Sequence, residues 1–597
     1  MRRKWSKLLG LLLVFGLIAA ACGDSSGDSA TDTTAASGDT TAAPTTAAVT
    51  STTQSDVVTS TEAPVQGPSY GGRVTVGLEA EAPGLRPWED ACSSPCRNMM
   101  INIYDKLFEI DNNFEPAGWL ATDISPNADF TVWTMNLREG VQFHNGKDFS
   151  AQTVADMFPI QQEGAISGGI LAAAGVIDIQ ATGDFEVTYT LSSGNSAFPA
   201  HLTGRGLGTV FDPELAVSDP DGYAQNPVGT GPFIMANRDI DNETLLVRNE
   251  NYWMTDEQGN SLPYLDEIAF RPIPDEGTRL SSLISGTVNA MQTLRQGTIR
   301  DARDADGLTL FEFQGNNVGG GQFNTLVAPY DDKRVRKGLT HLNNQDAVID
   351  ALGGTGISLP GSQWFSPDSP WYSEAAAAAW PQFDIPAGTA LLQEYIDDPT
   401  RSDGKAVGES IDVMLSCPPD PTLIAAMQVI EAVWTSTGIV NVELTQFDQA
   451  THINMSLGAD TNFVGTHEAH CWRWASDDDP STFLNNAFAA PTPEIAAEFG
   501  VPFSAVNFPN YWDPEMFGWL IEAVQTDDFD ERYALYEMVM LRFADEVPVW
   551  YSGHTATAIG VTEGITGLVG WVTPDGVLGA GTPGAEGRWH FVQITDG

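Results

Sequence analysis

The alternation of hydrophobic and polar positions predicts a short unit of strands, a turn and a helix in the first third of the chain. Residues 133–137 alternate between large apolar and polar side chains, which is typical of a strand with one buried face. A second strand is predicted at residues 141–143, ending at the turn-forming pair at 145–146. Ser150 then stands where it can cap a helix whose inner face begins with Val154.

The same analysis predicts helices that lead into strands in the last third. Residues 422–437 carry apolar side chains at helical spacing, and Gly438 can end that helix. Residues 440–444 then alternate as a strand, and a predicted helix at 533–543 precedes a predicted strand at 547–551. Helices that feed strands in this way indicate an α/β fold.

The amino terminus has the pattern of a secretory signal. Four basic residues precede an apolar run at 8–21 that ends in small residues before Cys22. This run is too short to cross a hydrocarbon core of about 30 Å comfortably. Residues 17–23 resemble a bacterial lipobox, which implies that Cys22 is acylated and anchors the protein to a membrane. The alternative is an ordinary signal peptide followed by a chance cysteine.

Residues 23–68 consist almost wholly of small and polar side chains, so we expect them to form a disordered tether. A flexible coil of that length would separate its ends by roughly 40 Å. The remaining body has no second apolar run long enough to span a membrane.

The charge of the chain narrows the range of partners. It contains 28 Lys+Arg against 79 Asp+Glu, a formal net charge of −51. Such a surface repels phosphate backbones and disfavours nucleic acid as a partner. The acidity either steers cationic ligands or is a general surface property, such as adaptation to a salty medium.

Four cysteines follow Cys22, and four cysteines allow three pairings. The loop between Cys92 and Cys96 is short enough to close on itself. The alternative is a metal-binding or redox-active pair, but no further ligands stand near it in the sequence.

The order of residues in several segments resembles that of a known family. In the first unit these are Trp133-Thr134, Leu137-Arg138, Gly140-Val141, Phe143-His144, Gly146 and Ala151; later ones are residues 226–233, 248–253 and 264–266. This order is similar to the signature of the bacterial extracellular solute-binding proteins of family 5, the peptide- and nickel-binding receptors of ABC importers. Asn145 and Thr153 replace residues that are usually acidic there.

The resemblance implies an α/β, two-lobed, periplasmic-binding-protein-like fold with an extra inserted subdomain and hinge strands between the lobes. We expect a signal peptide at 1–21 and a lipidated tether at 22–70. The first lobe is expected at 71–115, 232–318 and 545–597, the inserted subdomain at 116–231, and the second lobe at 319–544. The glycines at 319–321 have a plausible hinge role, with close packing as the alternative.

The resemblance also implies where a ligand binds. In peptide-binding relatives, a Trp-x-x-Asp sequence ahead of Pro and Phe-Leu supplies the carboxylate that pairs with the peptide's amino terminus, and Trp474 and Asp477 fit that spacing. The interval to Pro480 is one residue shorter than in those relatives, so Asp478 and Asp479 are substitutes, and a solvated loop or a capping role is the alternative. The expected ligand-binding residues are Asp477, Asp478, Trp474, Trp472 and Asn324. Family architecture puts Cys417 and Cys471 in one lobe, which favours the pairs Cys92–Cys96 and Cys417–Cys471.

These features predict a solute carrier and not an enzyme. His467 and His470 lack the spacing of a zinc protease helix, and no nucleophile elbow or Walker loop is present. We expect no cofactor and no bound metal, although His470 could ligate nickel directly. The expected protein is a monomeric, membrane-anchored extracytoplasmic receptor that passes an oligopeptide or dipeptide to an ABC permease. The alternatives are a non-peptide solute, such as a nickel complex or an oligosaccharide, and a sensory role.

Overall fold

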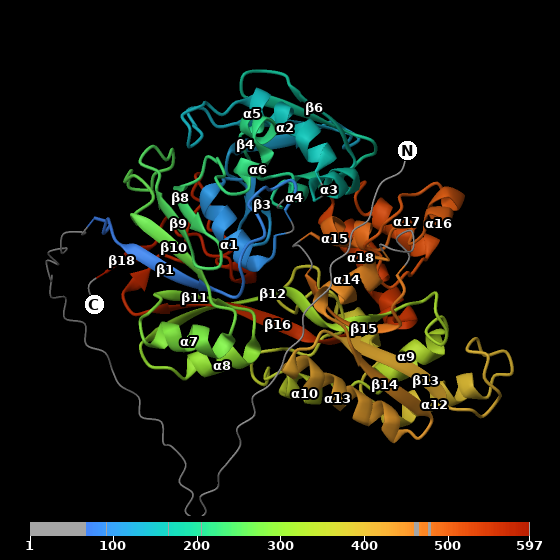
Figure 1. Cartoon of the computed structure of the whole chain (residues 1–597). Helices are drawn as coiled ribbons and strands as arrows, with labels where there is room; N and C mark the ends of the chain where they lie inside the picture. The colour runs from blue at the N-terminus through green and yellow to red at the C-terminus, as the bar shows by residue number, and fades with distance from the viewer. Residues whose placement is uncertain are drawn as a thin grey trace, which may run out of the picture. The chain divides into compact units, whose positions relative to one another are not determined.

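A ten-stranded sheet in the order β14-β13-β15-β12-β16-β11-β1-β10-β9-β8 is the largest element of the computed structural model (Figure 1). The structure describes residues 67–90, 92–164, 166–204, 206–458, 465–475 and 479–595. The strands of this sheet are β1 (Arg73–Leu78), β8 (Phe233–Asp239), β9 (Glu243–Arg248), β10 (Glu267–Pro272), β11 (Ala290–Thr293), β12 (Leu308–Phe323), β13 (Ile411–Cys417), β14 (Val440–Gln446), β15 (Ala469–Ala475) and β16 (Val549–Thr562).

The long strands β12 and β16 pair antiparallel in the middle of the sheet and take part in two different hydrophobic cores. One core consists of buried residues from 74–294 and 559–592, among them Ile559 of β16. The second consists of buried residues from 318–551, among them Val318 of β12. We call the parts of the chain around these cores the first and the second lobe. The predicted two-lobed α/β fold is confirmed, while the expected domain boundaries stay a prediction.

The first lobe carries a separate sheet in the order β4-β5-β7-β6. Its strands are β4 (Ala121–Pro126), β5 (Val132–Leu137), β6 (Val176–Ala181) and β7 (Glu186–Leu191). The alternating residues Trp133, Met135 and Leu137 are all buried, as the pattern predicted. The helix α2 (Ala151–Glu163) begins after Ser150, whose N–H donates to the hydroxyl oxygen of Thr153 at 3.2 Å.

The predicted strand at residues 141–143 is wrong. This segment forms one isolated bridge, between Gln142 and Asp148, around a turn in which Gly146 has a φ of +80°. The N–H of His144 donates to the carbonyl oxygen of Gly229 at 2.9 Å. The backbone of 141–143 itself bonds across the turn: the N–H of Phe143 donates to the carbonyl oxygen of Lys147 at 2.8 Å, and the N–H of Phe149 donates to that of Val141 at 2.9 Å. A single bridge therefore forms here and no regular strand.

The remaining elements complete the two lobes. In the first lobe they are α1 (Ser94–Ile103), β2 (Phe108–Ile110), β3 (Pro116–Gly118), α3 (Ser167–Ala174), α4 (Phe198–His201), α5 (Pro213–Ser218), α6 (Pro220–Tyr223), α7 (Glu276–Ile284), α8 (Gln296–Arg303), β17 (Ile565–Thr566), η1 (Pro583–Ala585) and β18 (Gln593–Ile594). In the second they are α9 (Lys333–His341), α10 (Gln345–Ala351), α11 (Glu374–Ala379), α12 (Ile385–Ile396), α13 (Pro421–Ser436), α14 (Gln449–Leu457), α15 (Pro480–Ala487), α16 (Pro493–Phe499), α17 (Pro514–Glu522) and α18 (Phe529–Glu546). The bounds of α13, β14 and α18 confirm the elements predicted for the last third of the chain.

A buried carboxylate, Asp105, joins three segments of the first lobe. Its Oδ1 accepts hydrogen bonds from Nε1 of Trp119 at 2.9 Å and the hydroxyl of Tyr252 at 3.0 Å. Its Oδ2 accepts from the hydroxyl of Thr230 at 3.0 Å and Nε1 of Trp253 at 2.9 Å. Burial raises the pKa of Asp105, and the donors act against that rise because they stabilise the ionised form.

We expect Asp105→Asn to destabilise the protein, because the new amide group would face two buried hydrogen-bond donors. The free energy of unfolding in urea, followed by tryptophan fluorescence, should fall by about 2–4 kcal/mol. Asp156→Asn makes the same chemical change on an exposed residue of α2 and should shift it by less than about 0.5 kcal/mol. A loss for the Asp105 variant no larger than that of this control would contradict the assigned role.

Candidate functional site

The strand β15 lies beside β12 in the part of the sheet that belongs to the second lobe. Trp474 of β15 is opposite Val318, and Arg473 is opposite Gly319. Because side chains alternate along a strand, Trp472 and Trp474 share one face of β15 and Arg473 lies on the other. The two faces have different environments.

The two predicted tryptophans lie on the face that packs into the second core. Trp474 is 2% exposed, and its ring meets that of Trp364 edge to face at 5.0 Å between centroids. Trp472 is half-buried, with its ring centroid 4.9 Å from that of Phe508. Packing of this kind holds the backbone of β15 in place, which is the role that both rings have in the described structure.

The polar residues predicted for the site do not lie together with the tryptophans in the described structure. Asp477 and Asp478 lie outside the described residues. Asn324 is buried: its Nδ2 donates to the carbonyl oxygens of Gly465 (2.9 Å) and His467 (2.8 Å). Its Oδ1 accepts from Nδ2 of Asn510 at 3.0 Å, so its amide group is occupied within the protein.

Asp479, the other substitute carboxylate, is also occupied. It caps α15 by accepting from the N–H of Ser481 at 2.9 Å. It also pairs with Arg532, whose Nη2 lies 2.7 Å from its Oδ2. This carboxylate therefore fixes the start of a helix.

Sequence reasoning missed Arg473, which is exposed on the face of β15 that points away from the two tryptophans. Desolvation lowers the pKa of Arg473, the nearby charges of Arg295 and Arg97 lower it further, and the charge of Glu79 acts in the opposite direction. Glu79 and both other arginines belong to the first lobe. Because Arg473 itself belongs to the second lobe, its exposed side chain lies within electrostatic range of charged groups of the other lobe. Its position between Trp472 and Trp474 was the signal in the sequence, because strand alternation places it on the opposite face.

The lobes also contact each other beside this position. Arg295 precedes α8 of the first lobe, and its Nη2 lies 3.9 Å from Oδ2 of Asp420 in the second. Asp420 caps α13 by accepting from the N–H of Thr422 at 2.9 Å. The N–H of Ser196 in the first lobe donates to the carbonyl oxygen of Val524 in the second at 2.7 Å.

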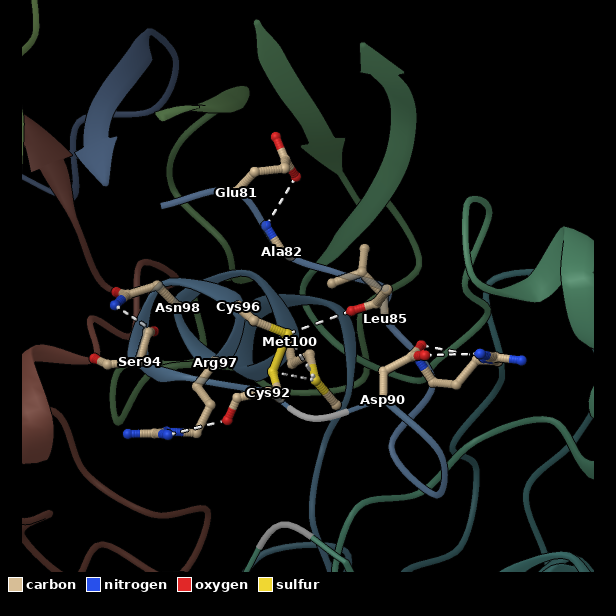
Figure 2. The surroundings of a disulfide bond; sticks show 12 residues. Glu81, Ala82, Leu85, Asp90, Cys92, Ser94, Cys96, Arg97, Asn98 and Met100 are labelled. Atoms are coloured by element: carbon tan, nitrogen blue, oxygen red, sulfur yellow. Dashed lines mark hydrogen bonds and ion pairs between the residues drawn. A yellow bond between two sulfur atoms is a disulfide. The ribbon is translucent and has the colours of Figure 1, made fainter. Parts of the chain in front are cut away.

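Two disulfides brace the segments that lead to Arg473 and Arg97. Cys417 is joined to Cys471, which ties the end of β13 to β15. Cys92 is joined to Cys96 at the start of α1 (Figure 2). Nη1 of Arg97 donates to the carbonyl oxygen of Cys92 at 3.2 Å, so this loop holds the guanidinium (Figure 2). These are the pairings that the sequence analysis favoured.

Three buried histidines form a cluster at β15. His470 belongs to this strand and lies on the same face as Trp472, and His452 and His467 pack against it. The ring centroid of His470 is 4.1 Å from that of His452 and 4.7 Å from that of His467. Burial lowers the pKa of all three rings, that of His467 to about 3. Among the described residues, no group of three or more His, Cys, Asp or Glu side chains is arranged to hold a metal ion.

The two-lobed fold, with charged groups of both lobes around one position, defines a solute-binding protein. The sequence profile of the bacterial extracellular solute-binding proteins, family 5, matches residues 115–493. The chain belongs to this family.

Relatives and solved structures extend the match to most of the chain. It is 25% identical over 504 residues to the dipeptide-binding protein of Escherichia coli (79% of this chain, 86% of that protein). It is 24% identical to the nickel-binding periplasmic protein of the same organism (75% and 83%). An ABC transporter-associated periplasmic binding protein from Helicobacter pylori, in complex with the peptide STSA, superposes with a TM-score of 0.71 at 21% identity, covering 88% of this chain and 99% of that one. No helix in the described parts of the chain is long and apolar enough to span a membrane.

The buried histidines predict how stability depends on pH. His467 stays neutral in the folded protein down to about pH 3, whereas an unfolded histidine takes up a proton near pH 6.5. The unfolded chain therefore binds more protons in this window, and the free energy of unfolding falls as the pH falls. Between pH 7 and pH 5, this one residue should account for a loss of about 2 kcal/mol.

His467→Phe removes the titrating group, so its unfolding free energy should fall by about 2 kcal/mol less over the same interval. The comparison is a series of urea unfolding curves at both pH values. Met538→Phe, at an exposed residue of α18 that carries no titrating group, is the control and should keep the wild-type pH dependence. Equal pH dependence of the His467 variant and the wild type would refute this account.

Proposed function

We propose that the protein is the lipid-anchored receptor of an ABC importer and that its solute is a short peptide. The observation that carries this proposal is the match to a dipeptide-binding protein along most of both chains. A match of that extent includes residues of both lobes. Acylation of Cys22 and a flexible segment at 23–68 would keep the body near the membrane while letting it reach a permease.

Capture would rest on closure of the lobes around the solute. β12 and β16 connect the two cores, so small changes along these strands would move one lobe against the other. A solute that contacts both lobes favours the closed arrangement by its difference in affinity for the two states. An extended peptide would bind through its backbone, with loose selectivity for side chains. The energy for transport would come from another subunit of the importer.

Within this proposal, Asp477 or Asp478 pairs with the ammonium group of the peptide. Both follow directly on β15, whose backbone the packing of Trp472 and Trp474 fixes. A carboxylate in a partly desolvated site forms a strong, charge-assisted hydrogen bond to an ammonium group. The tryptophans then contribute by positioning the strand.

A second candidate solute is a nickel complex, which the similarity to the nickel-binding periplasmic protein favours. In that case the metal would be cargo, held together with its own organic ligands. Binding of a nickel–histidine complex in preference to any peptide would decide for this candidate.

Binding without turnover is the expected behaviour. The purified full chain should show a rise in melting temperature with di- to tetrapeptides, because a ligand at about 100 times its Kd stabilises the folded state by roughly 2.7 kcal/mol. Mass spectrometry of solute released by denaturation should identify peptides. Stabilisation by another class of solute with no response to any peptide would exclude the peptide proposal, and peptide hydrolysis would exclude a pure receptor.

Lipid anchoring has its own test. Cys22→Ala should move the protein from the membrane fraction to the soluble fraction and abolish incorporation of labelled palmitate. Ser25→Ala, three residues further on, should leave both properties unchanged. Retention of the Cys22 variant in the membrane fraction would disprove the anchor.

A further inference from the structure

Arg473 differs from the other cations of this acidic protein. Every other lysine and arginine that the structure describes forms an ion pair with an Asp or Glu side chain. Within the described residues, the side chain of Arg473 has neither an ion pair nor a hydrogen bond. With 79 Asp and Glu in the chain, a guanidinium without a carboxylate calls for a physical reason.

The surroundings of Arg473 make a positive charge there unfavourable. The groups of like charge near it, Arg295 and Arg97, belong to the other lobe and already have partners: Arg295 pairs with Asp420, and Arg97 pairs with Glu586. Glu79, directly after β1, is the nearby opposite charge, and it also lacks an ion pair in the described structure. Groups held in unfavourable electrostatic surroundings inside a cleft are candidates for function.

The geometry leaves space beside the guanidinium. Arg473 pairs in register with Gly319, which has no side chain to cover that face of the sheet. A Cβ atom at Gly319 would meet no atom closer than 3.7 Å. The disulfide between Cys417 and Cys471 fixes the strand two residues before Arg473. The backbone that carries Arg473 is therefore fixed, and its exposed side chain lies beside a position that has no side chain.

We propose that Arg473 binds a carboxylate of the solute and that Glu79 disfavours solutes with net negative charge, so that the site selects zwitterions. A guanidinium presents paired N–H donors that match the two oxygens of a carboxylate. Glu79 would repel a solute that carries further anionic groups. A solute whose carboxylate is balanced by an ammonium group has no net charge and would still bind. This inference rests on the proposed function, and it adds the chemical class of the solute's anionic end.

Paired probes test this assignment on the full chain. Tri-alanine and tri-alanine amide differ in the carboxylate alone, and 4-aminobutyrate and its amide form a non-peptide pair. The wild type should bind an acid at least about tenfold more tightly than its amide, and Arg473→Gln should abolish that difference. Arg300→Gln, at an exposed arginine that pairs with Asp301, is the matched control and should keep it. The melting temperature of the unliganded Arg473 variant should not fall.

The outcomes separate this inference from the proposed function. Tri-alanine binding that is equal in the wild type and Arg473→Gln would overturn the role of Arg473 and leave the peptide proposal standing. Binding of 4-aminobutyrate alone, dependent on Arg473, would overturn the peptide proposal and support the subsite. A wild type that binds no acid more tightly than its amide would overturn the subsite.

The proposed role of Glu79 is tested by a separate measurement, the ratio of affinities for an anionic and a neutral peptide. Glu79→Gln should raise the affinity for tri-glutamate several-fold relative to tri-alanine. Glu250→Gln, at an exposed residue, should leave that ratio unchanged. An unchanged ratio in the Glu79 variant would remove Glu79 from the assignment.

Discussion

The first lobe depends on one buried charge. Asp105 accepts hydrogen bonds from side chains that stand 14 to 148 positions away along the chain. Such a group is stabilising only when its donors are all present, because a half-satisfied carboxylate in an apolar interior is worse than none. The network therefore requires the segments that carry Trp119, Thr230 and Trp253 to meet in one arrangement. The arrangement also orders the turn at 229–231, against which His144 packs.

The two cores are linked by the same pair of strands. β12 and β16 leave the first lobe paired and enter the second lobe still paired, so the sheet is continuous across the boundary. The backbone hydrogen bonds between these two strands therefore run from one lobe into the other. The register also shifts twice along this pair, between Gln314 and Val318 and between Gly319 and Gly320. The pairing is thus least regular near the strand that carries Arg473.

Local periodicity predicted the elements in which apolar side chains recur at regular spacing. The helix at 422–437 and the strand at 133–137 follow from apolar spacing alone. The strand predicted at 141–143 failed because its backbone bonds to the residues just after the following turn, Lys147 and Phe149, so that a single bridge forms in place of a regular strand. Family resemblance supplied the two-lobed fold, which periodicity cannot specify.

The candidate site, like the fold, could be predicted from the sequence only in part. Alternation along 470–475 could have placed Arg473 on the strand face opposite the tryptophans, but only the structure shows that no Asp or Glu among the described residues forms an ion pair with it. Resemblance directed attention to Asp477 and to Trp474, and the ring of Trp474 proved to be part of the core.

The disulfide between Cys417 and Cys471 has a consequence for when the site is completed. Thiols stay reduced in the cytosol and oxidise outside it. The newly made chain therefore lacks the covalent tie between β13 and the strand that presents Arg473. The short loop from Cys417 to Asp420, which carries the contact with Arg295, is likewise untied at that stage. Formation of this covalent tie is in this way linked to crossing the membrane, and a chain kept inside the cell would lack it.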